Sequence, residues 1–205
     1  MALFADRAHA GRELARSLER WRSTDAVVVG IARGGVIVAA STASELGLEL
    51  TAVAVRKLGV PGHEEVALGA IAAGVRIVVA GTAQGAGVDD EALARIEERE
   101  RAVLANRQQL IPDAAPPLTG RTVLLVDDGV ATGATANAAA RAIRAQGAAR
   151  VVLAVPVAPA SWAPDTAAVD DYSCAHPIDH FWAVGEFYDD FTQTTDEDVA
   201  AALAR

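Results

Sequence analysis

Two adjacent carboxylates, Asp127 and Asp128, follow an apolar run and precede a turn of small residues. The run 123–126 predicts a buried strand, and a helix is predicted to begin near residue 134. In an open α/β sheet, ligands bind beyond the carboxyl ends of the strands. These aspartates are therefore candidate ligand-binding residues.

The turn after the acid pair offers hydrogen-bond donors to an anion. Backbone amides at a helix N-terminus favour a phosphate, and Thr132 and Thr135 add hydroxyls. A cis-diol on the same ligand would explain the two carboxylates, because each can accept from one hydroxyl. Phosphate plus diol indicates ribose 5-phosphate. The alternative is that the aspartates only end a strand and Thr132 only caps a helix, but the ordered run of strand, acid pair, Thr-Gly-x-Thr and helix favours the ligand.

The run 123–135 resembles the signature of the type I phosphoribosyltransferases that binds 5-phosphoribosyl-1-pyrophosphate (PRPP). The family more often has an aliphatic residue where this chain has Gly129. The resemblance implies that Asp127 and Asp128 hold the ribose hydroxyls of PRPP. It also implies Mg²⁺ bound mainly through PRPP, and a homodimer. The implied ligands of the 5-phosphate are Ala131, Thr132, Gly133, Ala134 and Thr135.

Two further segments resemble parts of that family. Residues 32–35 (Ala-Arg-Gly-Gly) resemble its pyrophosphate loop, in which Arg33 and Gly34 would face the diphosphate. Arg56 and Lys57 resemble the position from which several members direct a cation at the leaving pyrophosphate. The resemblance implies pyrophosphate binding by all four residues and catalytic roles for Arg33 and Lys57. The alternatives are an ordinary strand-to-helix turn and an exposed surface cation, although Lys57 is the sole lysine of the chain.

Residues 182–185, with Asp189, resemble the C-terminal hood of the purine phosphoribosyltransferases. The resemblance implies that Trp182 stacks on a base and that Asp189 is linked indirectly to magnesium. A core tryptophan and a surface aspartate are the alternative. Residues 155–159 lack the basic residue that 6-oxopurine-specific members place before the hood, so the acceptor is not identified.

The remaining pattern predicts the elements that position these residues. Strands and helices alternate from residue 26 to residue 155, which is typical of an α/β fold with a doubly wound, mainly parallel sheet and flanking helices. We expect a single domain over residues 1–205, with a flexible loop at about 57–68 and a small C-terminal hood at about 157–191. Other expected elements are a helix capped by Asp6, a hairpin turning near Gly74, a charged helix at 89–110, and a closing helix capped by Thr195 and Asp198.

Composition excludes several classes of function. A net charge of −9 argues against nucleic-acid binding, which needs clustered cations. No segment approaches the roughly 20 apolar residues of a membrane helix. Cys174 is the only cysteine, which fits a reducing cytoplasm. His176 and His180 have a zinc-like spacing, but Pro177 lies between them, so we expect no metal site there.

The sequence thus predicts transfer of the 5-phosphoribosyl group from PRPP to a nitrogen acceptor, for example a nucleobase, with release of pyrophosphate. No residue is identified as a general base. A different class stays open, namely a non-catalytic module that senses PRPP or a nucleotide and regulates a partner through the charged helix 89–110. A hydrolase or phosphorylase acting on a phosphoribosyl compound is the third hypothesis.

Overall fold

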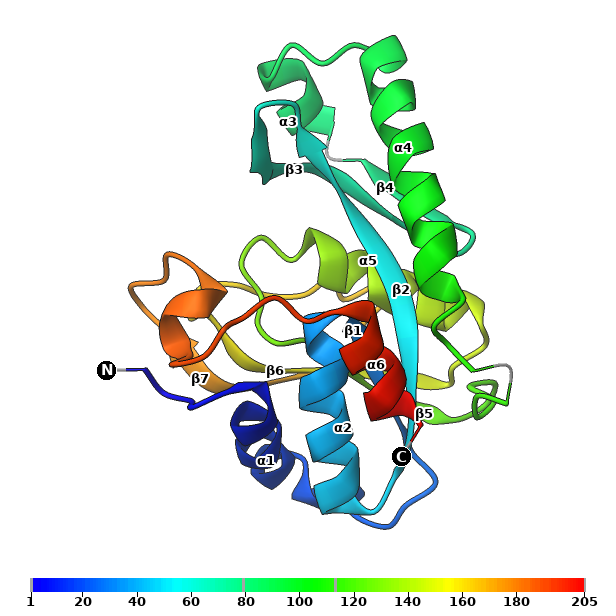
Figure 1. Cartoon of the computed structure of the whole chain (residues 1–205), viewed down its shortest axis with the longest axis vertical. Coiled ribbons are helices and arrows are strands. Elements are labelled where there is room, and N and C mark those ends of the chain that lie inside the picture. The colour runs from blue at the N-terminus through cyan, green and yellow to red at the C-terminus, as the bar shows by residue number, and fades with distance from the viewer. Residues whose placement is uncertain (1, 79, 113, 205) are drawn as a thin grey trace.

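A seven-stranded sheet forms the centre of the molecule, with strand order β4-β3-β2-β1-β5-β6-β7 (Figure 1). The computed structural model describes residues 2–78, 80–112 and 114–204. Strands β2, β1, β5, β6 and β7 are parallel, and β3 and β4 are antiparallel. The predicted mainly parallel sheet is confirmed. The strands are β1 (Val27–Ala32), β2 (Glu49–Val60), β3 (His63–Ala72), β4 (Val75–Val78), β5 (Thr122–Val126), β6 (Arg150–Pro159) and β7 (Asp171–Ile178).

Helices cover both faces of the parallel strands, as a doubly wound sheet requires. Because side chains alternate along a strand, Val28 and Leu124 pack towards α1 and α2, whereas Val29 and Leu125 pack towards α5. This two-sided burial explains why the strands are apolar runs without alternation. The helices are α1 (Arg7–Ser17), α2 (Gly34–Leu46), α3 (Ala80–Gly85), α4 (Asp90–Gln108), α5 (Ala134–Ala145) and α6 (Asp196–Leu203), with 3-10 turns at Glu19–Trp21 and Val184–Phe187.

The chain order of the strands reverses at β1, which pairs with β2 on one side and with β5 on the other. The connections after β1 and β5 therefore leave the same edge of the sheet side by side. This is the topological switch point at which open α/β sheets bind ligands. The predicted acid pair and residues 32–35 both lie there.

The predicted helix caps are confirmed. Asp6 accepts a hydrogen bond from the amide of His9, and Thr195 and Asp198 form a reciprocal capping box on α6. Gly47 ends α2 in the left-handed conformation, as its position in the sequence predicts.

The predicted loop at 57–68 is instead part of a long hairpin, which is a correction. Strands β2 and β3 continue to Val60 and from His63, and the chain turns at Pro61 and Gly62. Gly62 has φ 77°, which suits the third position of a tight turn. The glycines and the proline of this segment form the turn and a bulge near Gly59, which is why the composition of the segment resembles that of a loop.

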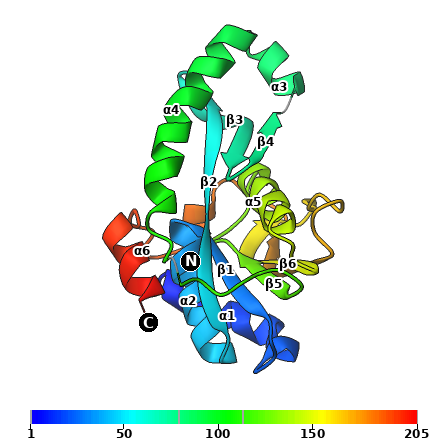
Figure 2. The same cartoon turned by 90° about the vertical axis from the view of Figure 1, so that its right-hand side faces the viewer.

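The extended hairpin is buried against α4, which lies beside the upper half of β2 (Figures 1 and 2). Leu58 and Leu68 pack against Leu93 and Ile96 of that helix. The charged helix predicted at 89–110 is therefore not solvated on every side. Its inward face also carries Glu100, which pairs with Arg56 of β2.

Replacing Leu58 by alanine should destabilise this upper lobe. Leu58 is fully buried, and removing such a side chain costs about 2–5 kcal/mol through lost burial and the cavity that is left. Thermal unfolding and hydrogen exchange of α4 amides measure the effect. Val66→Ala is the matched control, because Val66 of the same hairpin is 42% exposed. Equal protection of α4 in both variants would contradict the packing described.

The predicted hood at 157–191 is smaller than expected, and the N-terminus contributes to it. Strand β7 falls inside this range but pairs with β6 in the main sheet. Its residues are mostly half-buried and form no continuous apolar run, so the sequence did not indicate this strand. The aromatic cap that remains, residues 181–191, packs on Phe4 from the N-terminus, and the amide of Asp189 donates to the Phe4 carbonyl at 2.8 Å.

Among the described helices, none is both long enough and apolar enough to cross a membrane.

Candidate active site

The acid pair is held rigidly at the end of β5. The Nε of Arg7 donates to Oδ2 of Asp128 at 2.8 Å, and the amide of Asp128 donates to Oδ1 of Asp127 at 3.0 Å. The hydroxyl of Tyr188 donates to the Asp128 carbonyl at 2.6 Å. The side chains of Arg7 and Asp128 are only 11% and 17% exposed. Asp128 and its arginine partner are therefore largely shielded from solvent.

Burial changes the acidity of both aspartates. It raises the pKa of Asp127 well above its ordinary value, and the neighbouring charge of Asp128 raises it further. Burial also raises the pKa of Asp128, against the opposing effect of the Arg7 guanidinium. Two like charges side by side resist joint ionisation, so the site favours a ligand or cation that neutralises them.

The small-residue turn, residues 131–135, borders a cavity of about 180 Å³, which Ala131, Thr132, Gly133 and Thr135 line and Ala134 does not. Within the described residues, none of the amides of this turn donates to a backbone carbonyl, and α5 begins directly after Gly133. This is the arrangement in which a helix N-terminus binds an anion. The cavity, called here the Thr132 cavity, is lined by that turn together with Lys57, Asp127 and Val184.

Trp162 supports the turn from behind. Gly133 has φ 81°, and a Cβ atom there would lie 2.5 Å from the indole ring of Trp162. The indole Nε1 also donates to the Thr132 carbonyl at 3.4 Å. Gly133 is thus required both by its backbone conformation and by the close ring.

Gly129, the departure from the family signature, is explained by the aromatic cap. A Cβ atom at this position would lie 2.6 Å from Val184 and 3.0 Å from Val157. Those two valines occupy the space that an aliphatic side chain at position 129 would need. The turn is therefore closely packed at Gly129.

The segment 32–35, called here the Arg33 loop, lies directly against the acid pair. A Cβ atom on Gly34 would lie 2.1 Å from Oδ2 of Asp128, and one on Gly35 would lie 2.9 Å from Oδ1 of Asp127. The peptide bond between Ala32 and Arg33 is cis. The loop borders a second cavity of about 300 Å³, the Arg33 cavity, whose lining includes Arg7, Arg33, Gly34 and Phe191.

Arg56 and Lys57 point to opposite faces of β2, because neighbouring strand residues alternate. Lys57 lines the Thr132 cavity beside Asp127. Arg56 turns to α4, where its Nε and Nη2 donate to Oε2 of Glu100 at 2.8 and 2.6 Å. Sequence reasoning grouped both with Arg33 at the pyrophosphate, but the structure places these three cations at different points around the site.

The two residues predicted in the hood lie outside both cavities. Trp182 is 86% exposed, so it is not a core tryptophan. Asp189 is exposed and forms part of the backbone pairing with Phe4. Val184, two residues after Trp182, is the hood residue that reaches the Thr132 cavity.

A model of the phosphoribosyl transferase domain matches residues 4–192, which include every element of this site. The chain belongs to this family. Two Mycobacterium tuberculosis proteins named as phosphoribosyl transferases are 43% identical over 209 residues, covering 100% of this chain and 47% of each relative. The chain thus spans about half the length of these curated relatives.

Solved structures agree with this phosphoribosyl transferase fold. The protein TT1426 from Thermus thermophilus is 40% identical, and the match covers 99% of this chain and 98% of that protein with a TM-score of 0.74. A hypothetical Neisseria gonorrhoeae protein with bound ppGpp is 14% identical, with a TM-score of 0.52 over 97% and 91% of the two chains. The second likeness shows the fold alone.

Sequence reasoning missed three residues of this candidate site. Arg7 and Tyr188 approach Asp128 from the two ends of the chain, and Trp162 backs the small-residue turn. No local motif indicates these contacts, because each depends on how distant segments pack. Asp6, the predicted helix cap directly before Arg7, was the only nearby signal, and it indicated the start of a helix and not a binding site.

Ribose 5-phosphate should bind this site more weakly as the pH falls. The loss of affinity should begin at a higher pH than it would for an aspartate with an ordinary pKa. Asp127 has a raised pKa, so it becomes protonated above the usual range and then loses acceptor capacity for a ribose hydroxyl. Calorimetric titration from about pH 8 to about pH 5 measures the loss. Inorganic phosphate, titrated in parallel, corrects for protonation of the phosphate itself. A constant ratio of the two affinities over this range would contradict the prediction.

Proposed function

We propose that this chain transfers the 5-phosphoribosyl group from PRPP to a nitrogen acceptor and releases pyrophosphate. The observation that supports this most strongly is the presence of two cavities on either side of one carboxylate pair. The Thr132 cavity contains Asp127, and the Arg33 cavity contains Arg7, whose guanidinium binds Asp128. PRPP carries a monophosphate, a diol and a diphosphate in this order, and so matches the two cavities and the acids between them.

The reaction breaks the bond between the ribose C1 and the diphosphate oxygen while a bond to the acceptor nitrogen forms. The bonding electrons leave with the diphosphate, and positive charge develops on the ribose ring. The protein mainly has to position the reactants and stabilise the leaving group. In our proposal the amides of residues 131–135 fix the 5-phosphate, Asp127 and Asp128 fix the ribose, and Lys57 and Arg33 supply positive charge.

The acid pair fits a magnesium ion that the ligand itself brings. Among the described residues there is no cluster of three or more His, Cys, Asp or Glu side chains that could hold a metal. Mg²⁺ does not need such a cluster, because it commonly binds one or two carboxylates together with substrate phosphates. Asp127 and Asp128 would provide these carboxylates, with Asp189 at most an indirect contributor. The ion would neutralise charge on the diphosphate.

The acceptor should enter on the side of the aromatic cap. Val184 lines the Thr132 cavity, and the exposed indole of Trp182 stands two residues before it. An exposed aromatic surface two residues from a cavity-lining valine favours a planar acceptor such as a nucleobase. We further propose a homodimer that acts in the cytoplasm.

The decisive experiment offers PRPP and Mg²⁺ to the protein with a panel of nucleobases and amines, and measures pyrophosphate release. Release with at least one acceptor, together with the matching nucleotide product, supports the transferase. The Asp127→Asn, Asp128→Asn double variant is the negative control. PRPP binding without release across the panel would instead favour the sensing module, and release without an acceptor would indicate a hydrolase.

A further inference from the structure

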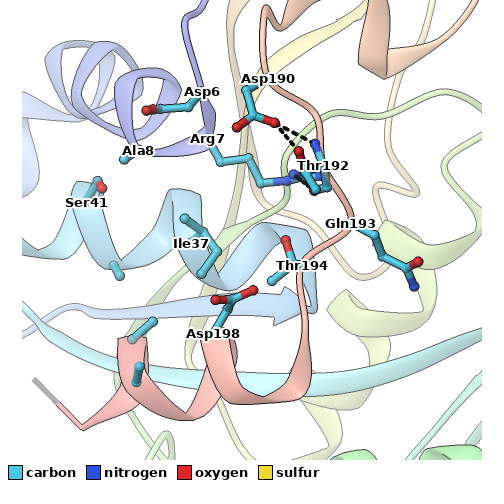
Figure 3. A pocket seen from close by; sticks show the side chains of 13 residues that line it. Asp6, Arg7, Ala8, Ile37, Ser41, Asp190, Thr192, Gln193, Thr194 and Asp198 are labelled. Atoms are coloured by element: carbon cyan, nitrogen blue, oxygen red, sulfur yellow. Dashed lines mark hydrogen bonds between the residues drawn. The ribbon is translucent and has the colours of Figure 1, made fainter.

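Arg7, at the first turn of α1, reaches across the molecule into the candidate site. Its side chain runs from the helix to the C-terminal segment beyond the aromatic cap (Figure 3). Nε donates to Asp128 at 2.8 Å, and Nη1 donates to the Thr192 carbonyl at 2.8 Å. The guanidinium carbon lies 3.9 Å from the centre of the Phe191 ring. Three contacts, one with the acid pair and two with the C-terminal segment, therefore fix the plane of this cation.

The Arg7 guanidinium has one nitrogen that can still serve a ligand. Within the described residues, its Nη2 donates no hydrogen bond, and this atom is not fully buried. Arg7, Arg33 and Gly34 all line the Arg33 cavity, and a Cβ atom on Gly34 would lie 2.8 Å from Nε of Arg7. A guanidinium can bind a phosphate through two parallel N–H groups while its Nε serves another acceptor.

We propose that Arg7 binds the diphosphate half of PRPP in the Arg33 cavity with the same guanidinium that orients Asp128. This inference rests on the proposed function and adds a binding residue that lies outside the strand-end loops. Arg7 would then contact both the ribose-binding carboxylate and the diphosphate, and would fix their positions relative to each other.

The charges around the cavity support Arg7 as its principal fixed cation. Arg33 is drawn towards Asp196 of α6, with 3.4 Å between Nη1 and Oδ1. Arg7 is the more buried of the two, and its carboxylate partner, Asp128, is also the proposed ligand of ribose. A buried cation interacts with a bound diphosphate more strongly than an exposed one, because solvent screens it less.

Titration calorimetry of the full chain with magnesium pyrophosphate, and separately with ribose 5-phosphate, tests the proposal. Arg7→Gln and Arg7→Lys should each weaken pyrophosphate binding by about 10- to 100-fold, the value of one or two charge-assisted hydrogen bonds. Lysine keeps the charge but lacks the planar fork, so it should not restore the wild-type affinity. Arg16→Gln, on the exposed face of the same helix, should leave both affinities unchanged.

The two ligands separate binding from positioning. If Arg7 only positions Asp128, both variants would lose affinity for ribose 5-phosphate and lose no more affinity for magnesium pyrophosphate than Asp128→Asn does, which would overturn the proposal. If the wild-type protein binds neither ligand, the proposed function fails and the inference fails with it. Should the variants not fold, wild-type crystals with magnesium pyrophosphate decide the question. Diphosphate oxygens within hydrogen-bonding distance of Arg7 support the proposal, and a diphosphate that contacts only the Arg33 loop overturns it.

Discussion

Replacing Asp127 and Asp128 together by asparagine should weaken the binding of ribose 5-phosphate and PRPP by roughly 10²- to 10⁴-fold. Each carboxylate is proposed to accept a hydrogen bond from one ribose hydroxyl, and a hydrogen bond to a charged group is worth about 1.5–3 kcal/mol. Asparagine has nearly the same shape, so the variant removes the charge and one acceptor oxygen of each residue without creating a cavity. It should also bind magnesium pyrophosphate less well, because the carboxylates proposed to share the ion are gone.

The double variant should fold at least as stably as the wild type near neutral pH. Burial raises the pKa of both aspartates, which means that their ionised forms are disfavoured in the folded protein. Thermal unfolding checks this, and calorimetry measures the ligands. Asp171→Asn is a suitable control, because Asp171 also pairs with an arginine but lies at the start of β7, at the opposite edge of the sheet. Wild-type affinity in the double variant would remove the basis for assigning ribose to these acids.

Replacing Gly133 by alanine should lower the affinity for inorganic phosphate and ribose 5-phosphate at least tenfold, on the order of 1.4 kcal/mol or more. The new methyl group would lie 2.5 Å from the Trp162 ring, and the backbone there has φ 81°. The turn or the indole must move, which displaces the amides of residues 131–135 that are proposed to bind the phosphate.

A control separates the steric effect from backbone strain. Gly120 also has a positive φ, 75°, but nothing lies within 4 Å of the position that a Cβ atom would take there. Gly120→Ala should therefore share the cost of the left-handed conformation, about 1–2 kcal/mol, and leave phosphate binding unchanged. Equal phosphate affinity in the two variants would show that the turn at Gly133 does not form the anion site.

The sequence predicted those parts of the site that are carried by local segments. The acid pair, the small-residue turn and the Arg33 loop each lie in one short run of chain at the end of a strand. Strand alternation and the switch-point rule were then sufficient to bring these runs together. For this reason the fold and the centre of the site could be predicted before any contact was known.

Residues outside that centre depend on packing between distant segments. Arg7 and Asp128 are 121 positions apart, and Trp162 meets Thr132 over 30 positions. Nothing in the local sequence distinguishes Arg7 from the other arginines of α1. Phe4 likewise carries no local signal that the N-terminus would complete the aromatic cap.

The hairpin at 57–68 shows the opposite error, in which local composition was given too much weight. Glycine and proline are typical of loops, and the segment contains both, yet Leu58 and Leu68 provide enough burial against α4 to hold two strands. Arg56 follows from the same packing. Once α4 covers that face of β2, Glu100 becomes the acceptor for Arg56, and Lys57 on the other face lines the Thr132 cavity.

A crystal structure of the chain with PRPP and Mg²⁺ tests the central claim most directly. We predict the 5-phosphate against the amides of residues 131–135, the ribose hydroxyls on Asp127 and Asp128, and the diphosphate in the Arg33 cavity. A 5-phosphate bound away from Thr132, or ribose hydroxyls that make no contact with the two aspartates, would contradict the account.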